Sequence, residues 1–171
     1  MITNSRSDNV NTRNLVVDIL LAVTRDGAFS HIAIRDVLDK YRYLPKQDRA
    51  FITRLSQGTI ERMIELDAII NQFSKTKVKK MKPVIAAILR SGVYQLKYMD
   101  SVPDSAACNE AVKLTVKRGF GGLKGFVNGV MPVSYTHLPG AVERDGAGTA
   151  HFAGARQNRN ALCITAFYCI G

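Results

Sequence analysis

Residues 85–99 constrain the fold of this 171-residue chain more than any other stretch. Apolar residues recur there at intervals of three and four, which places them on one face of an α-helix: Ile85, Ile88, Leu89, Gly92, Val93, Leu96 and Met99. Ala86, Ala87 and Tyr94 widen that face, and Pro83 lies near the start, where a missing N–H costs no hydrogen bond. A helix that is apolar around most of its circumference is a buried helix. The stretch therefore predicts the central helix of an all-α bundle.

Six other segments have the same periodicity and are separated by turn residues. They are predicted to begin near Thr12, near Ala28 or Ser30, and at residues 46, 65, 103 and 123. Asp26-Gly27, Leu44-Pro45 and the glycines at 119–122 interrupt the pattern between helices. No segment shows the sustained alternation of a β-strand. The sequence therefore predicts an all-α fold with about seven helices before residue 131.

The ends of the chain differ from this helical part. Residues 1–11 are polar and without periodicity, which predicts a disordered basic arm. Residues 131–171 contain five glycines and no helical stripe, and Met131-Pro132 is expected to end the last helix because proline removes a backbone donor. The predicted division is an arm at 1–11, a helical domain at 12–130 and an unstructured or artefactual tail at 131–171.

The tail begins with an unusual run of residues. Residues 133–138 read Val-Ser-Tyr-Thr-His-Leu, which looks like one reading frame of the transposon end used in sequencing-library preparation. We hypothesise that residues from about 132 onward are an assembly or frame artefact fused to a truncated gene. Nucleotide reads across codons 125–145 test this, and uniform coverage through the junction would contradict it.

The charge of the chain suggests an anionic partner. The net charge is +10, the isoelectric point is about 9.8, and residues 1–130 carry +9 of that excess. Nucleic acid is the commonest partner of so basic a chain, although many basic proteins bind none. No apolar run reaches the length of a membrane span, and the N-terminus has no apolar signal region, so we expect no membrane partner. Three cysteines without metal-type spacing are typical of a reduced, cytoplasmic protein.

The densest positive charge lies in residues 75–82, which we call the lysine segment. Clustered lysines neutralise phosphates and give salt-dependent affinity that is blind to sequence. A solvated loop at a helix start fits the same run equally well. Further cations lie on other predicted helices. The lysine segment and these additional cations are Lys75, Lys77, Lys79, Lys80, Lys82, Arg49, Arg54, Lys113, Lys117 and Arg118.

Residue types that often serve in catalysis have simpler interpretations here. His31 near a helix start favours a surface or capping role, and Cys108 on an apolar helix face favours a structural thiol. Asn109-Glu110 is expected to satisfy backbone groups of a neighbouring helix. The glycines at 119–125 match neither phosphate-binding fingerprint and favour a turn. We find no catalytic pairing and no metal-ligand spacing, so the residues alone predict a basic helical domain that binds an anionic polymer.

Five spaced motifs add a family resemblance over residues 12–130. In order they are Asp48-Arg-Ala-Phe51 followed by Leu55 and Gly58, Ile88-Leu-Arg-Ser-Gly-Val-Tyr-Gln-Leu96, Val102-Pro103, Asn109-Glu-Ala-Val112, and Phe126-Val-Asn-Gly-Val130. Together they resemble the NusB family of helical RNA-binding domains. The opening motif and the spacing are most similar to the N-terminal domains of ribosomal RNA small-subunit cytosine-5 methyltransferases. Stand-alone transcription antitermination factors are the alternative.

The resemblance implies two packed helical subbundles and an RNA partner. The methyltransferase interpretation implies that the domain helps to place an enzyme on ribosomal RNA. It also implies an S-adenosylmethionine site and a catalytic cysteine in a second domain. Cys163 and Cys169 lack the Pro-Cys context of that site. The alternative implies a transcript leader and a ribosomal-protein partner. Antitermination factors use a basic N-terminal segment for RNA, which adds Arg6 and Arg13. The predicted RNA contacts are Arg6, Arg13, Arg49, Lys75, Lys77, Lys79, Lys80, Lys82, Lys113 and Lys117.

Overall fold

A computed structural model describes residues 10–136, 143–144 and 150–151, and it confirms the predicted all-α class. The chain forms two units, Met1–His137 and Leu138–Gly171. In the described part of the second unit, β1 (Glu143–Arg144) pairs antiparallel with β2 (Ala150–His151). In that of the first, the α-helices are α1 (Thr12–Thr24), α2 (Ser30–Lys40), α3 (Lys46–Glu61), α4 (Met63–Phe73), α5 (Pro83–Tyr98), α6 (Asp104–Lys117) and α7 (Lys124–Thr136).

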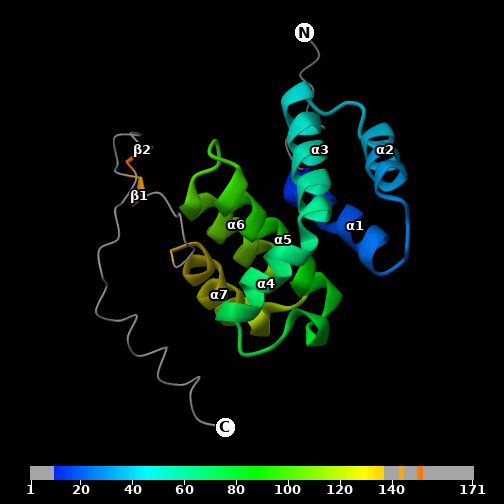
Figure 1. The fold of residues 1–171 in the computed structure, drawn as a ribbon. Coiled ribbons are helices and arrows are strands. Elements are labelled where there is room, and N and C mark those ends of the chain that lie inside the picture. Colours follow the sequence, from blue (N-terminus) through cyan, green and yellow to red (C-terminus); the bar gives the residue numbers. More distant parts are fainter. Residues whose placement is uncertain (1–9, 137–142, 145–149, 152–171) are drawn as a thin grey trace, which may run out of the picture. The chain divides into compact units, whose positions relative to one another are not determined.

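The seven helices form two groups that meet at α5. Helices α1, α2 and α3 pack on one another, and α4, α6 and α7 pack with α5 (Figure 1). Helix α5 also contacts α1 and α3, so it touches both groups. This arrangement confirms the two predicted subbundles and the central place of residues 85–99. None of the described helices is long and apolar enough to cross a membrane.

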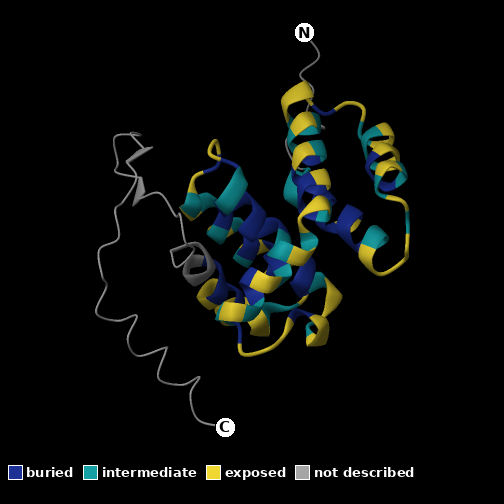
Figure 2. Ribbon diagram, in the orientation of Figure 1, coloured by how far each residue is buried: buried dark blue, intermediate teal, exposed yellow. Residues whose placement is uncertain are grey.

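The burial of α5 explains its central position. Eleven of its sixteen residues are buried, and Ile85, Ile88 and Leu89 are each exposed by 1% or less. Figure 2 shows buried residues concentrated along α5, with exposed residues on the outer faces of the surrounding helices. As predicted, Pro83 occupies the first helical position. The apolar stripe thus removes α5 from water on nearly all sides, which is the main source of stability in a helical bundle.

Two glycines let neighbouring side chains approach helix backbones. A Cβ at Gly58 on α3 would lie 2.0 Å from the hydroxyl oxygen of Tyr94 on α5. A Cβ at Gly92 on α5 would lie 2.4 Å from the terminal methyl of Met131 on α7. Real Cβ contacts are never so short, so each position requires glycine unless its neighbour moves. Gly58 therefore brings α3 against α5, and Gly92 does the same for α7.

The prediction that Met131-Pro132 ends the last helix is wrong. Helix α7 continues through Pro132 to Thr136, and Met131 is completely buried. Proline inside a helix removes one hydrogen bond and costs about 3 kcal/mol. The apolar face of α7 offsets that cost, because Val127, Val130 and Met131 are all buried. Packing on α5 therefore overrides the local signal.

The start of α1 is held by residues from α6. Asn11 caps α1, because its Oδ1 accepts a hydrogen bond from the Asn14 amide at 3.0 Å. The Asn11 amide group donates to Glu110 at 3.2 Å. Residue 11 was predicted to belong to a disordered arm, and residues 1–9 lie outside the described residues. Asn11 is instead the N-cap of α1, tied to α6.

A second tie joins the two helices at the end of α6. The Arg118 guanidinium donates to the Asn14 side-chain oxygen at 2.8 Å and to the Asn14 carbonyl at 2.9 Å. It also forms an ion pair with Asp18 at 2.7 Å. Arg118 follows α6 directly and the Arg118 side chain is mostly buried, so these contacts fix α1 against α6 at a separation of 104 residues.

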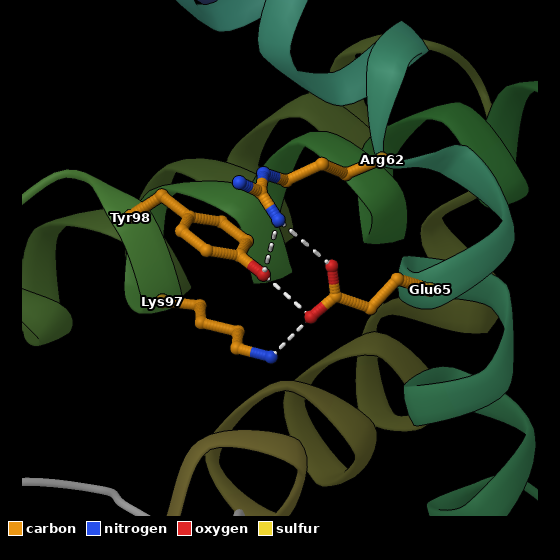
Figure 3. Close-up of polar contacts among 4 residues, drawn as sticks. All are labelled: Arg62, Glu65, Lys97 and Tyr98. Carbon is orange, nitrogen blue, oxygen red and sulfur yellow. Dashed lines mark hydrogen bonds and ion pairs between the residues drawn. The ribbon is translucent and has the colours of Figure 1, made fainter.

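A polar cluster joins the start of α4 to the end of α5 (Figure 3). The Glu65 carboxylate accepts hydrogen bonds from Lys97, from the Tyr98 hydroxyl at 2.5 Å and from Arg62 at 3.2 Å. The Arg62 guanidinium also lies 4.5 Å from the centre of the Tyr98 ring. The hydrogen bond from Lys97, and then that from Tyr98, lowers the pKa of Glu65 to about 2. Arg62 also lies between the two helices, as the C-cap of α3 and the N-cap of α4.

We expect Glu65→Gln to remove a pH-dependent part of the stability. Because the pKa of Glu65 is lowered in the folded state, its contribution is present above about pH 5 and is lost as the pH falls toward 2. The Glu65 side chain is 38% exposed, so solvent screening limits the contribution to about 1 kcal/mol. Urea unfolding should show a larger difference in stability between parent and variant at pH 7 than at pH 2.5. Glu61→Gln, on exposed α3 surface, is the control.

Candidate functional site

The lysine segment is an ordered connection between α4 and α5. Ser74 and Val78 are buried, whereas Lys75, Lys77 and Lys79 are exposed. The Val78 amide donates to the Asn71 side-chain oxygen at 2.8 Å. The short 3₁₀-helix η1 (Val78–Lys80) follows. Lys80 is also exposed, and Lys82, the N-cap of α5, is exposed as well. Buried residues thus anchor the segment while its five lysines face solvent.

The charge around these lysines is unbalanced. No acidic residue occurs from 68 to 99. The other two cations of that stretch are engaged, since Arg90 pairs with Asp67 through two hydrogen bonds of 2.6 and 2.7 Å and Lys97 pairs with Glu65. None of the five lysines forms an ion pair with an acid in the described part of the chain, and only Lys77 has a hydrogen bond, 3.3 Å to the Asn71 carbonyl. The positive charge of the segment is therefore not neutralised by ion pairs within the described residues.

The remaining predicted contacts lie on other elements. Arg49 is half-buried in the first turn of α3, and Lys117 is exposed in the last turn of α6. Lys113 is exposed but forms an ion pair with Glu110 at 2.9 Å, and this hydrogen bond lowers the pKa of Glu110. Arg6 lies outside the described residues. Of the predicted RNA contacts that the structure describes, the lysines of residues 75–82 form one exposed segment, and the others lie on separate helices.

Arg13 is held by contacts within the domain. Its Nε donates to the Gln95 side-chain oxygen at 2.7 Å, and its guanidinium lies 5.0 Å from the centre of the Phe51 ring. Burial lowers the pKa of Arg13, and the Glu110 carboxylate opposes this effect. Arg13 thus joins α1 to α3 and α5. Its assignment as an RNA contact stays a prediction.

The other residues considered for chemistry have structural surroundings. Cys108 is half-buried on α6, and burial raises the pKa of its thiol. Asn109 is exposed, whereas Glu110 binds the side chain of Asn11 rather than the backbone groups expected. His31 is exposed at the start of α2, as expected. Cys163 and Cys169 lie outside the described residues.

The expected turn between α6 and α7 is present. It includes η2 (Gly121–Leu123), and Gly119 adopts a φ of +83°, which favours glycine.

The sequence-based prediction missed one feature. The turn between α2 and α3 exposes Tyr43, which lies between Lys40 and Lys46 in the chain. In the sequence, only the mixture of aromatic and basic residues at 40–46 indicates it.

Comparisons with known proteins place this arrangement in a family. The model described as NusB family matches residues 10–133. The probable ribosomal RNA small subunit methyltransferase B of Bacillus subtilis is 34% identical over 119 residues, which cover 70% of this chain and 26% of that protein. The corresponding protein of Synechocystis is 36% identical over 122 residues, and 27% of it is covered. The chain thus spans about a quarter of the length of these relatives.

Two further matches are antitermination proteins. The transcription antitermination protein NusB of Agathobacter rectalis is 40% identical over 86 residues, which cover 50% of this chain and 66% of that protein. A solved structure of antitermination factors NusB and NusE in complex with dsRNA has a TM-score of 0.68 at 20% identity. It covers 74% of this chain and 95% of that chain, and it shows the common fold. The family match extends from the cap of α1 into α7, and the chain belongs to the NusB family.

Proposed function

We propose that this domain binds RNA and that the lysine segment contacts the phosphates. The observation that carries the proposal is a set of five exposed lysines on an anchored segment, within a stretch that contains no acid. Lysines in this setting bind phosphate as point charges and release counterions. The solved structure of NusB and NusE with dsRNA supports RNA as the anionic partner.

We further propose that the RNA is ribosomal and that the domain serves a small-subunit cytosine-5 methyltransferase. The 34% and 36% identity to the probable methyltransferases of Bacillus subtilis and Synechocystis supports this. In such a protein, S-adenosylmethionine would supply the methyl group in another domain. The residues described here would bind the RNA and position it.

The second candidate function is transcription antitermination. The 40% identity to the Agathobacter rectalis protein supports it. Under this alternative the partner would be a ribosomal protein together with a transcript leader. The gene downstream of codon 130 distinguishes the two, since a methyltransferase reading frame favours the first and a stop codon within a few residues favours the second.

Changing Lys77, Lys79 and Lys80 together to Gln should flatten the salt dependence of RNA binding. Each phosphate contact to single-stranded RNA contributes about −0.7 to the slope of log affinity against log salt, so three lost contacts change it by about two units. Affinity should fall similarly for all RNAs, because phosphate contacts carry no base information. Fluorescence anisotropy across a salt series measures both quantities, with a ribosomal RNA hairpin and an unrelated RNA.

The matched control removes cations that already have acidic neighbours. Arg25 pairs with Asp26 at 2.7 Å and Arg35 lies 3.8 Å from Asp36, and all four side chains are exposed. The double variant Arg25→Gln, Arg35→Gln should leave the slope nearly unchanged. Equal slopes for the parent and the lysine variant would contradict the phosphate contacts, and the lysine segment would then be a solvated loop without a role in RNA binding.

A further inference from the structure

The turn between α2 and α3 exposes an aromatic ring at a fixed place. Tyr43 is 45% exposed, and its ring centre lies 6.0 Å from that of Tyr41 at a tilt of 57°. The turn is closed by a hydrogen bond from the Leu44 amide to the Tyr41 carbonyl at 3.1 Å. Leu44 is buried, and Pro45 leads directly into α3. The backbone that carries Tyr43 is therefore anchored at both ends.

Basic residues flank Tyr43 on both sides in the chain. The Lys40 ammonium lies 5.7 Å from the centre of the Tyr41 ring, and Lys46 begins α3 beyond the turn. Both lysines are exposed and, among the described residues, neither forms an ion pair. Arg42 is different, because it binds Asp39 at 3.1 Å. Asp48, in the first turn of α3, is the other acid beside the turn. The charge that remains near Tyr43 is positive.

This combination fits one kind of ligand. An exposed ring with neighbouring cations stacks a nucleic-acid base while the cations hold the adjacent phosphates. Lys40 already covers Tyr41, which leaves the more exposed Tyr43 to meet a base. In a duplex the base faces are stacked on one another, so the ring selects unpaired nucleotides.

We propose that Tyr43, backed by Tyr41, is a stacking platform for an unpaired base of single-stranded RNA. Lys40 and Lys46 hold the phosphates on either side. This proposal rests on the proposed function. It specifies how an RNA-binding domain would distinguish single-stranded from duplex RNA, since the phosphate contacts of the lysine segment do not. The platform is carried by the first subbundle, whereas the lysine segment joins α4 to α5 in the second.

The chain offers a matched control for an exposed aromatic. Phe29 is 71% exposed as the N-cap of α2, at the opposite end of that helix from Tyr41. Its aromatic neighbour is His31, at 6.0 Å between ring centres. The nearby Arg25 is paired with Asp26, so the surroundings of Phe29 lack the excess positive charge of the α2–α3 turn.

The chain contains no tryptophan, so one introduced at either position reports on that position alone. We expect the emission of the Tyr43→Trp variant to be quenched by a 12-nucleotide single-stranded RNA and much less by a 12-base-pair duplex. The emission of the Phe29→Trp variant should change with neither. Tyr43→Ala should weaken single-strand binding roughly 5- to 150-fold, and Tyr43→Phe should retain it. Circular dichroism melts confirm that each variant folds.

The outcomes separate the two proposals. If the parent binds single-stranded RNA but Tyr43→Ala binds it equally well, the platform is wrong and the proposed function stands. Equal quenching of the two tryptophan variants, or equal quenching by single strand and duplex, also overturns the platform. If the parent binds no RNA in anisotropy at low salt, both proposals fail.

Discussion

Leu89→Ala is expected to lower the free energy of unfolding by about 2–5 kcal/mol, which is a large part of the stability of a domain this size. Leu89 is completely buried on α5, the helix that contacts both subbundles. Replacing leucine by alanine loses the transfer free energy of three carbon groups and leaves a cavity in the core. Urea denaturation followed by circular dichroism measures the loss through the transition midpoint.

The control for this prediction is Ile64→Ala. Ile64 on α4 is 89% exposed, so its truncation should change the free energy of unfolding by less than about 0.5 kcal/mol. If the Leu89→Ala and Ile64→Ala midpoints are the same, α5 does not form the centre of the core. A changed slope with an unchanged midpoint would point instead to an altered denatured state.

Gly58→Ala is expected to lower the free energy of unfolding by about 1–3 kcal/mol in net. The new Cβ would lie 2.0 Å from the Tyr94 hydroxyl and 2.2 Å from the ring carbon that carries it. A tyrosine ring in a packed core has no flexible end to withdraw, so α3 and α5 must separate. The gain in helix propensity from glycine to alanine, about 1 kcal/mol, offsets only part of this cost.

Two other glycines make the comparison quantitative. Gly92→Ala meets the flexible end of Met131, so a smaller loss is expected there than at Gly58. Gly129→Ala on α7 meets nothing within 4 Å and should stabilise the domain by up to about 1 kcal/mol. In thermal melts, the melting temperature should therefore be lowest for Gly58→Ala, higher for Gly92→Ala and highest for Gly129→Ala. Equal destabilisation by Gly58→Ala and Gly129→Ala would mean that the α3–α5 contact is not as close as described.

Sequence periodicity predicted the helices because burial on one face leaves a signal in the order of residues. The central helix shows this best, since its apolar stripe extends from Ile85 to Leu96 and every residue of the stripe is buried. The end of α7 was predicted incorrectly because Pro132 is a strong local signal. The fit of Met131 against Gly92, which decides the outcome, joins residues 39 positions apart. Such contacts are invisible to a local pattern.

In the candidate site, too, features that are local in the chain could be predicted, and contacts between distant residues could not. The lysine segment stands out because its five charges lie within eight residues of the chain, and the structure leaves them exposed. Arg13 looked similar in the sequence, but its partners Phe51 and Gln95 come from α3 and α5. Tyr43 was missed for a different reason. An aromatic residue beside a helix end is most often part of the core, and only its exposed fraction distinguishes it.

The contacts between α1 and α6 determine when the domain can fold during synthesis. The cap of α1 is bound by Glu110, and its first turn is bound by Arg118. About a hundred residues must be added after α1 emerges before these partners exist, which takes roughly 5–20 seconds at the usual rates of translation. Helix α1, with Val16, Val17 and Leu20 buried, packs instead on α2, α3 and α5, which are all synthesised before α6. During synthesis the apolar contacts of α1 can therefore form before the polar contacts that attach it to α6.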